Sequence, residues 1–199
     1  IIYGYFQAKY AIRKSDEVVF VEGNMDVIAS HQAGVGQVVA SSGTALTLDQ
    51  LKSISKLTKN VKLAFDTDAA GLAATQRAIE LCQQLGLTLK VVAMAAKDPD
   101  ELIKKDVRAW SGAIAEAAYV IDYLLEHYSQ TLDITSSLGK KQYTDMVLPS
   151  IKRLSDPVEQ DHYLHELVSQ TGSTMESLRH KQKESKDAAT PQSARDIAP

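Results

Sequence analysis

The sequence has only one cysteine, Cys82, among its 199 residues. A single cysteine cannot form a disulfide within the chain, which agrees with a reducing compartment such as the cytosol. Cys82 lies inside a helical pattern of apolar residues, so we expect its thiol to serve as a small buried apolar group.

Long hydrophobic runs and excess positive charge are also missing. No apolar segment approaches the roughly 20 residues of a membrane-spanning helix, so no membrane partner is expected. The net charge is −3, which argues against a strong stand-alone nucleic-acid binder. Any basic surface must then be local or come from another segment. No signal peptide is visible, and because the chain starts at Ile1 rather than Met we expect it to be a piece of a longer protein.

What the chain does contain is an alternation of strand and helix patterns. Apolar, β-branched runs predict four strands, each followed by a helical pattern, at residues 18–21, 37–40, 61–65 and 89–94. Such alternation implies right-handed crossovers and a mainly parallel four-stranded sheet flanked by helices, an α/β fold. Beyond Trp110 the patterns are all helical, which predicts a C-terminal helical bundle.

These patterns predict four parts. They are a connecting segment at 1–14, an α/β domain at 15–108, a helical bundle at 109–182 and a disordered tail at 183–199.

Acidic residues follow three of the four predicted strands. They are Glu22 after the first, Asp66 and Asp68 after the third, and Asp98 and Asp100 after the fourth. The carboxyl ends of parallel strands meet at one edge, which is where ligands bind in open α/β sheets. Taken alone, Asp68 could simply cap the next helix. Five carboxylates at one edge instead predict a site for a hard divalent cation such as Mg²⁺.

Four motifs around these acids resemble the Toprim domain, most closely that of bacterial DnaG-type primases. They are VEGNMDV at 21–27, SGTALT at 42–47, DTDAAG at 66–71 and DPDEL at 98–102. Each motif alone is weak, but four in order at compatible spacing are specific. The resemblance covers about residues 18–105 and implies the Toprim fold.

The resemblance also implies roles for the acids. Glu22, Asp66 and Asp68 would be catalytic, and with Asp98 and Asp100 they would be metal ligands. Asp26 would be a secondary acid of the same site. The backbone at Gly23, Gly43, Thr44 and Gly71 would lie near the nucleotide. The implied reaction is Mg²⁺-dependent attack of a 3′-hydroxyl on a nucleoside triphosphate, with Mn²⁺ able to substitute.

Three positions depart from the primase pattern. Thr67 stands where the family usually has Gly, Asn24 replaces the usual Tyr, and Ser42 replaces the usual Leu. No acid is lost, so metal binding is still expected. We expect the three departures to affect how the nucleotide fits the site and how fast the reaction runs.

The primase resemblance implies a single-stranded DNA template, nucleoside triphosphates and an RNA primer as partners, in the bacterial cytoplasm at the nucleoid. The resemblance assigns binding of the replicative helicase to a C-terminal domain that is missing from this piece. The family's zinc ribbon needs several Cys and His ligands, so no zinc is expected in this piece. Without that ribbon and the basic half of the polymerase core, the piece alone should make few or no primers.

Several alternatives stay open. A Toprim nuclease or a topoisomerase-type enzyme would share these acids, and a non-enzymatic module docking a replication protein would use the bundle. His162, His165 and Glu166 could be zinc ligands, although a solvated helix face is the better interpretation. Trp110 and the tyrosines after it could stack on bases, but at helical spacing they fit a bundle core better.

Overall fold

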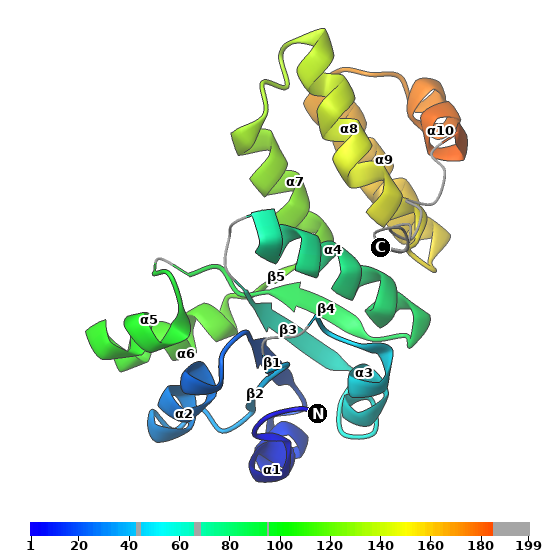
Figure 1. The fold of residues 1–199 in the computed structure, drawn as a ribbon. Helices are drawn as coiled ribbons and strands as arrows, with labels where there is room; N and C mark the ends of the chain where they lie inside the picture. The colour runs from blue at the N-terminus through cyan, green and yellow to red at the C-terminus, as the bar shows by residue number, and fades with distance from the viewer. Residues whose placement is uncertain (43–44, 66–68, 95, 185–199) are drawn as a thin grey trace, which may run out of the picture. The chain divides into compact units, whose positions relative to one another are not determined.

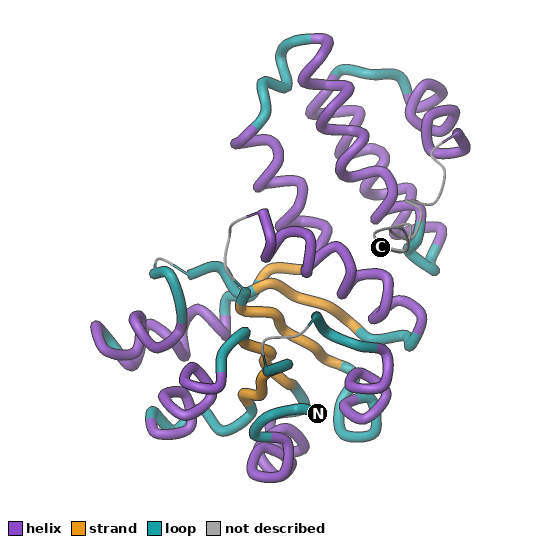
Figure 2. Tube along the Cα trace, viewed as in Figure 1, coloured by secondary structure: helices purple, strands orange, loops and turns teal. Residues whose placement is uncertain are grey.

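The computed structural model describes residues 1–42, 45–65, 69–94 and 96–184. The chain divides into two compact units, Ile1–Tyr123 and Leu124–Pro199. The first unit holds a sheet with helices around it, whereas the described part of the second holds helices and loops (Figure 2). The predicted domain boundaries at residues 14, 108 and 182 remain predictions, and from residue 185 the predicted tail lies outside the described residues.

The sheet of the first unit has five strands in the order β2-β1-β3-β4-β5. The strands are β1 (Val18–Val21), β2 (Val38–Ala40), β3 (Asn60–Ala64), β4 (Thr88–Val91) and β5 (Ala118–Tyr119). Strands β1 to β4 pair in parallel. All four residues of β1 are buried, as expected for a parallel sheet covered on both faces.

Strand β5 corrects the predicted number of strands. The prediction of a mainly parallel α/β sheet is confirmed, but the sheet has a fifth strand, which pairs antiparallel with β4. It falls in a segment that the sequence analysis expected to be helical throughout. Two residues are too few to show the alternation that marks a strand. This segment becomes a strand because it forms backbone hydrogen bonds with the open edge of β4.

Helices cover both faces of the sheet. Those of the first unit are α1 (Tyr5–Ser15), α2 (Asn24–Gln32), α3 (Leu48–Ile54), α4 (Ala69–Gln84), α5 (Pro99–Lys105) and α6 (Val107–Ala115). On one face, Val19 and Val21 belong to the same buried cluster as Val27 of α2, Leu102 of α5 and Trp110 of α6. Helix α4 lies on the opposite face (Figure 1). Trp110 is fully buried, so it is a core residue and not a base-stacking surface.

The charged side chain of Lys62 also enters this core. Lys62 of β3 is 8% exposed, and its ammonium lies 2.6 Å from Glu17 Oε2 and 2.8 Å from the carbonyl oxygen of Ile114. A buried cation needs such partners, because losing water without them is costly. Lys62 thereby ties the centre of the sheet to the end of α6.

The second unit is built from α7 (Val120–Thr131), which begins just before it, α8 (Ser137–Lys152), α9 (Pro157–Thr171) and α10 (Met175–Glu184). Tyr143 of α8 is fully buried; its hydroxyl donates a hydrogen bond to Gln170 Oε1 of α9 and lies 3.3 Å from the carbonyl oxygen of Leu125. Asp156 caps α9 by accepting hydrogen bonds from the amides of Val158 and Glu159. Among the described residues, none of the helices is both long and apolar enough to cross a membrane.

Candidate metal and nucleotide site

The carboxyl ends of three adjacent strands lie level with one another. Val21 of β1 pairs in register with Ala40 of β2 and with Ala64 of β3. Glu22, the residue after Val21, is exposed at this edge of the sheet. The strand ends therefore bring the first acid motif and the loop after β2 to the same level, as the parallel topology predicts.

Asp26 connects this edge to a distant part of the chain. It lies in the first turn of α2 and is 8% exposed. One carboxylate oxygen, Oδ2, accepts a hydrogen bond from the amide of Gly23 at 3.1 Å, and Oδ1 accepts one from the amide of Asp100 at 3.4 Å. Asp26 therefore joins the turn after β1 to the start of α5, 74 residues away in the sequence.

Gly23 allows this arrangement by its lack of a side chain. A Cβ atom at Gly23 would lie 2.9 Å from Asp26 Oδ2, which is too close for an ordinary contact. The sequence analysis predicted close backbone approach at Gly23, with the nucleotide as the approaching group. In the structure the group that approaches is the carboxylate of Asp26.

The last acid motif forms the start of α5. Asp98 caps this helix, and its Oδ1 accepts a hydrogen bond from the amide of Glu101 at 2.8 Å. Asp100 forms an ion pair with Lys104, one helical turn later, at 2.5 Å. The sequence analysis did not identify Lys104 as a partner, although the spacing of four residues is a signal that could have found it.

The three carboxylates influence one another. Burial raises the pKa of the Asp26 carboxyl above its usual range, and the negative charges of Asp98 and Asp100 raise it further. The hydrogen bonds from the amides of Gly23 and Asp100 act in the opposite direction. The region thus concentrates negative charge that a cation would relieve.

The structure places only part of the predicted site. Glu22, Asp26, Asp98 and Asp100 lie at the starts of α2 and α5, and the two helices pack together. Gly71 is buried in the first turn of α4. The predicted site residues Asp66, Asp68, Gly43 and Thr44 lie outside the described residues, as does Thr67. Within the described part of the chain, no three His, Cys, Asp or Glu side chains are arranged to hold a metal ion.

Two departures from the family pattern contact each other. The hydroxyl of Ser42 donates a hydrogen bond to Asn24 Oδ1 at 3.2 Å, which links the loop after β2 to the first residue of α2. Ser42 has a φ of 59°, in the left-handed region that is uncommon for a residue other than glycine. The sequence analysis treated Asn24 and Ser42 as separate changes, and only the fold brings them together.

Comparison with known protein families gives one match in the α/β part of the chain and one in the helical part. Residues 19–103 match the family of Toprim-like domains, and residues 121–174 match the DnaB-helicase binding domain of primase. The second match lies within the chain, whereas the sequence analysis placed helicase contact on a domain beyond Pro199.

Relatives and solved structures agree with these matches. A DNA primase of Halalkalibacterium halodurans is 34% identical over 185 residues, which is 92% of this chain and 31% of the relative. A crystal structure of a DNA primase domain from Pseudomonas aeruginosa is 26% identical, with a TM-score of 0.75 over 92% of this chain and 59% of that one. A DnaG primase catalytic domain bound to ssDNA is also 26% identical, with a TM-score of 0.72 over 88% of this chain and 57% of that one.

The fold and the positions of the motifs define a Toprim domain, a class whose members bind divalent metal ions. Together with the match at 121–174, this domain gives the chain a combination that resembles the DnaG-type DNA primases. The chain spans less than a third of the length of the curated relatives it matches first.

Proposed function

We propose that this chain is the catalytic Toprim segment of a primase that makes RNA primers for DNA replication in the bacterial cytoplasm, at the nucleoid. Its substrates would be nucleoside triphosphates and the growing RNA primer, on a single-stranded DNA template. The observation that carries the proposal is the bridge from Asp26 to Gly23 and Asp100. This bridge holds acids from two distant motifs at the edge of the sheet where ligands bind.

The donor atoms at this edge fit a hard cation. Carboxylate oxygens are the ligands that Mg²⁺ prefers, and it commonly uses one or two of them together with substrate phosphates. Both oxygens of Asp26 already accept amide hydrogen bonds, so Asp26 fits a positioning role. Among the described residues, Oδ2 of Asp98 has no hydrogen-bond partner, so it is available as a ligand. Glu22, Asp98 and Asp100 would then share the metal with Asp66 and Asp68.

A bound Mg²⁺ ion, or Mn²⁺ in its place, would lower the pKa of the attacking 3′-hydroxyl and neutralise charge on the pyrophosphate. The chain's own residues would do the rest. Glu22 would accept or orient the proton of the 3′-hydroxyl. Asp26 would hold the start of α5 in place, and the backbone near Gly23, Gly43, Thr44 and Gly71 would face the nucleotide.

The metal site is tested by thermal melting of the 199-residue chain. Metal that binds only the folded state raises stability by about 2.7 kcal/mol at a concentration 100 times its Kd. We expect Mg²⁺ to raise the melting temperature, Asp66→Asn with Asp68→Asn to abolish the increase, and the exposed Asp49→Asn to leave it unchanged. An increase that survives in the double variant would show that this pair does not bind the metal.

The role of Glu22 is tested in the full-length enzyme. Loss of a ligand can be compensated by excess metal, whereas loss of a general base slows chemistry by about 10²–10⁴-fold with metal still bound. We expect Mn²⁺ to restore part of the primer synthesis of Asp68→Asn, and Glu22→Gln to bind metal normally yet stay inactive. Equal loss of metal and equal rescue in both variants would make Glu22 another ligand.

We also propose that residues 121–174 contact the replicative helicase, because this segment matches the helicase-binding family. A pull-down of purified helicase by the 199-residue chain tests this proposal. Retention of no helicase above background would contradict it.

A further inference from the structure

The helical unit contains a basic hollow between α8 and α10, with a volume of about 520 Å³. Three lysines line it, namely Lys140, Lys141 and Lys181. The other lining residues are hydroxyl-bearing side chains and Leu178, and no carboxylate is among them. Positive charge is therefore concentrated on the wall of the hollow.

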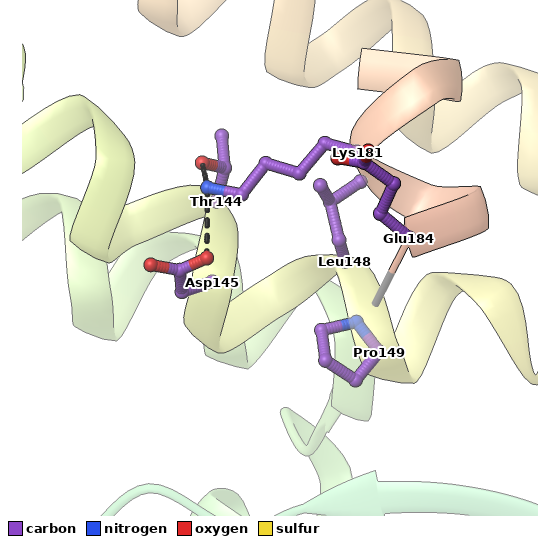
Figure 3. Close-up of a pocket in the computed structure, with 6 residues that line it drawn as sticks. All are labelled: Thr144, Asp145, Leu148, Pro149, Lys181 and Glu184. Atoms are coloured by element: carbon purple, nitrogen blue, oxygen red, sulfur yellow. Dashed lines mark hydrogen bonds and ion pairs between the residues drawn. The ribbon is translucent and has the colours of Figure 1, made fainter. Parts of the chain in front are cut away.

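The three lysines are not equivalent. The ammonium of Lys181 lies 2.8 Å from Asp145 Oδ1 and donates hydrogen bonds to Thr144 Oγ1 at 2.6 Å and to the carbonyl of Lys141 at 2.9 Å. These contacts fix Lys181 across α8 and α10, where it also lines a smaller neighbouring hollow (Figure 3). In contrast, the ammonium groups of Lys140 and Lys141 have no partner among residues 1–42, 45–65, 69–94 and 96–184. Two cations are therefore available to a ligand.

Neutral donors surround these cations. Ser137 starts α8 and Ser173 lies in the turn before α10, and their hydroxyl groups have no partner in the described part of the chain. A Cβ atom at Gly172 would lie 3.9 Å from Lys140 Nζ, so the Lys140 ammonium reaches toward that same turn. The hollow thus offers N–H and O–H donors from two segments more than 30 residues apart in the sequence.

We propose that this hollow binds a backbone phosphate of a single-stranded nucleic acid, at a site separate from the acids at the sheet edge. The inference rests on the proposed function, which supplies the ligand. Lysine binds phosphate as a point charge, whereas planar carboxylates are recognised mainly by the bidentate fork of arginine. The walls carry lysine and hydroxyl donors and no arginine, a set that suits the tetrahedral oxygens of a phosphate better than an acidic peptide.

The net charge of the helical unit confines binding of a nucleic acid to the hollow. Residues 124–184 contain seven Lys and Arg against nine Asp and Glu, so the unit is net negative. Such a surface would repel a polyanion except where lysines gather without acids. The hollow therefore gives the strand one anchoring point instead of a continuous track.

Salt dependence measures the anchoring. On a single strand, each neutralised phosphate contributes about 0.7 to the slope of log K against log salt concentration. If Lys140 and Lys141 each neutralise one phosphate, their loss reduces the slope by about 1.4. With equal binding of both chains at about 1 M salt as the reference, this corresponds to roughly tenfold weaker binding at 200 mM salt and roughly sixtyfold at 50 mM.

The experiment uses the 199-residue chain and a fluorescein-labelled 12-nucleotide oligo(dT), with EDTA present so that the metal site does not contribute. Anisotropy is measured from 50 to 200 mM NaCl for the unchanged chain and for Lys140→Gln with Lys141→Gln. Lys152→Gln with Lys183→Gln is the matched control, because it removes the same charge from α8 and α10 outside the hollow. We expect the loss of slope and affinity in the first pair only. Neither Lys140 nor Lys141 has a side-chain partner in the described structure, so melting temperatures should stay unchanged.

Backbone amide NMR on the same complex locates the strand. Shifts at Lys140, Lys141 and Ser177 support the proposal. The proposal is overturned if the chain does not bind oligo(dT), if both double variants lose equal affinity, or if only a Glu-rich peptide shifts these amides. The metal-dependent melting described above is independent of these readings, so either proposal can fail while the other stands.

Discussion

The bridge made by Asp26 gives a prediction that separates positioning from metal binding. Replacing Asp26 by Ala removes the acceptor for the amides of Gly23 and Asp100. If the bridge holds these two segments together, the variant should lose stability and the amides should lose their protection from exchange. If Asp26 is only a metal ligand, neither property should change without metal.

The expected cost follows from the geometry. A hydrogen bond to a charged group contributes about 1.5–3 kcal/mol. The bond from Gly23, at 3.1 Å, is within the usual range, whereas the bond from Asp100, at 3.4 Å, is longer than usual and counts for less. Removing the carboxylate also removes the penalty of burying its charge, which is why its pKa is raised. We therefore expect a net loss of about 2 kcal/mol, or roughly 4–8 °C in melting temperature.

The assay combines urea unfolding with amide hydrogen exchange, both in EDTA. Asp106→Ala is the matched control, because Asp106 also caps a helix, through the amide of Arg108, but contacts no distant segment. We expect exchange at Gly23 and Asp100 to accelerate in Asp26→Ala and to stay unchanged in Asp106→Ala. Unchanged exchange and stability in Asp26→Ala would refute the bridging role.

Two further predictions concern the core. Lys62→Met should cost about 3 kcal/mol of unfolding free energy in a urea titration, because it leaves Glu17 and the carbonyl of Ile114 without their buried cation. Lys52→Met, which breaks an exposed pair with Asp49 at 3.6 Å, should cost at most about 0.5 kcal/mol, and equal costs would show that burial is irrelevant. Burial raises the pKa of the Cys82 thiol from 9.0 to about 12, so its contribution to stability is present below pH 9 and is lost as the pH rises toward 12. Cys82→Ala should therefore lessen the fall in stability over that range, and the folded chain should resist a thiol reagent at pH 8; rapid labelling without urea would contradict this.

The sequence by itself determined the class of fold. Buried strands such as β1 are apolar throughout, and the helices between them fix parallel crossovers, so the order of patterns was sufficient. The four motifs indicated the Toprim class by their resemblance to that family, and three of them place acids just after strand ends, which meet at one edge of a parallel sheet. The strand patterns, helix patterns and motifs can each be identified from a short stretch of sequence, without knowledge of the tertiary structure.

Only the tertiary structure decided which groups meet. Asp26 and Asp100 are 74 residues apart, Ser42 and Asn24 are 18 apart, and Lys62 and Ile114 are 52 apart. No periodicity encodes such pairs, because they arise from how α2, α5 and α6 pack on the sheet. Strand β5 is likewise too short to show a strand pattern in the sequence. It forms because β4 offers backbone groups at its edge that need hydrogen-bond partners. In the sequence, Lys140 and Lys141 are typical of surface charges, and only the packing of α10 beside α8 makes them part of the lining of a hollow.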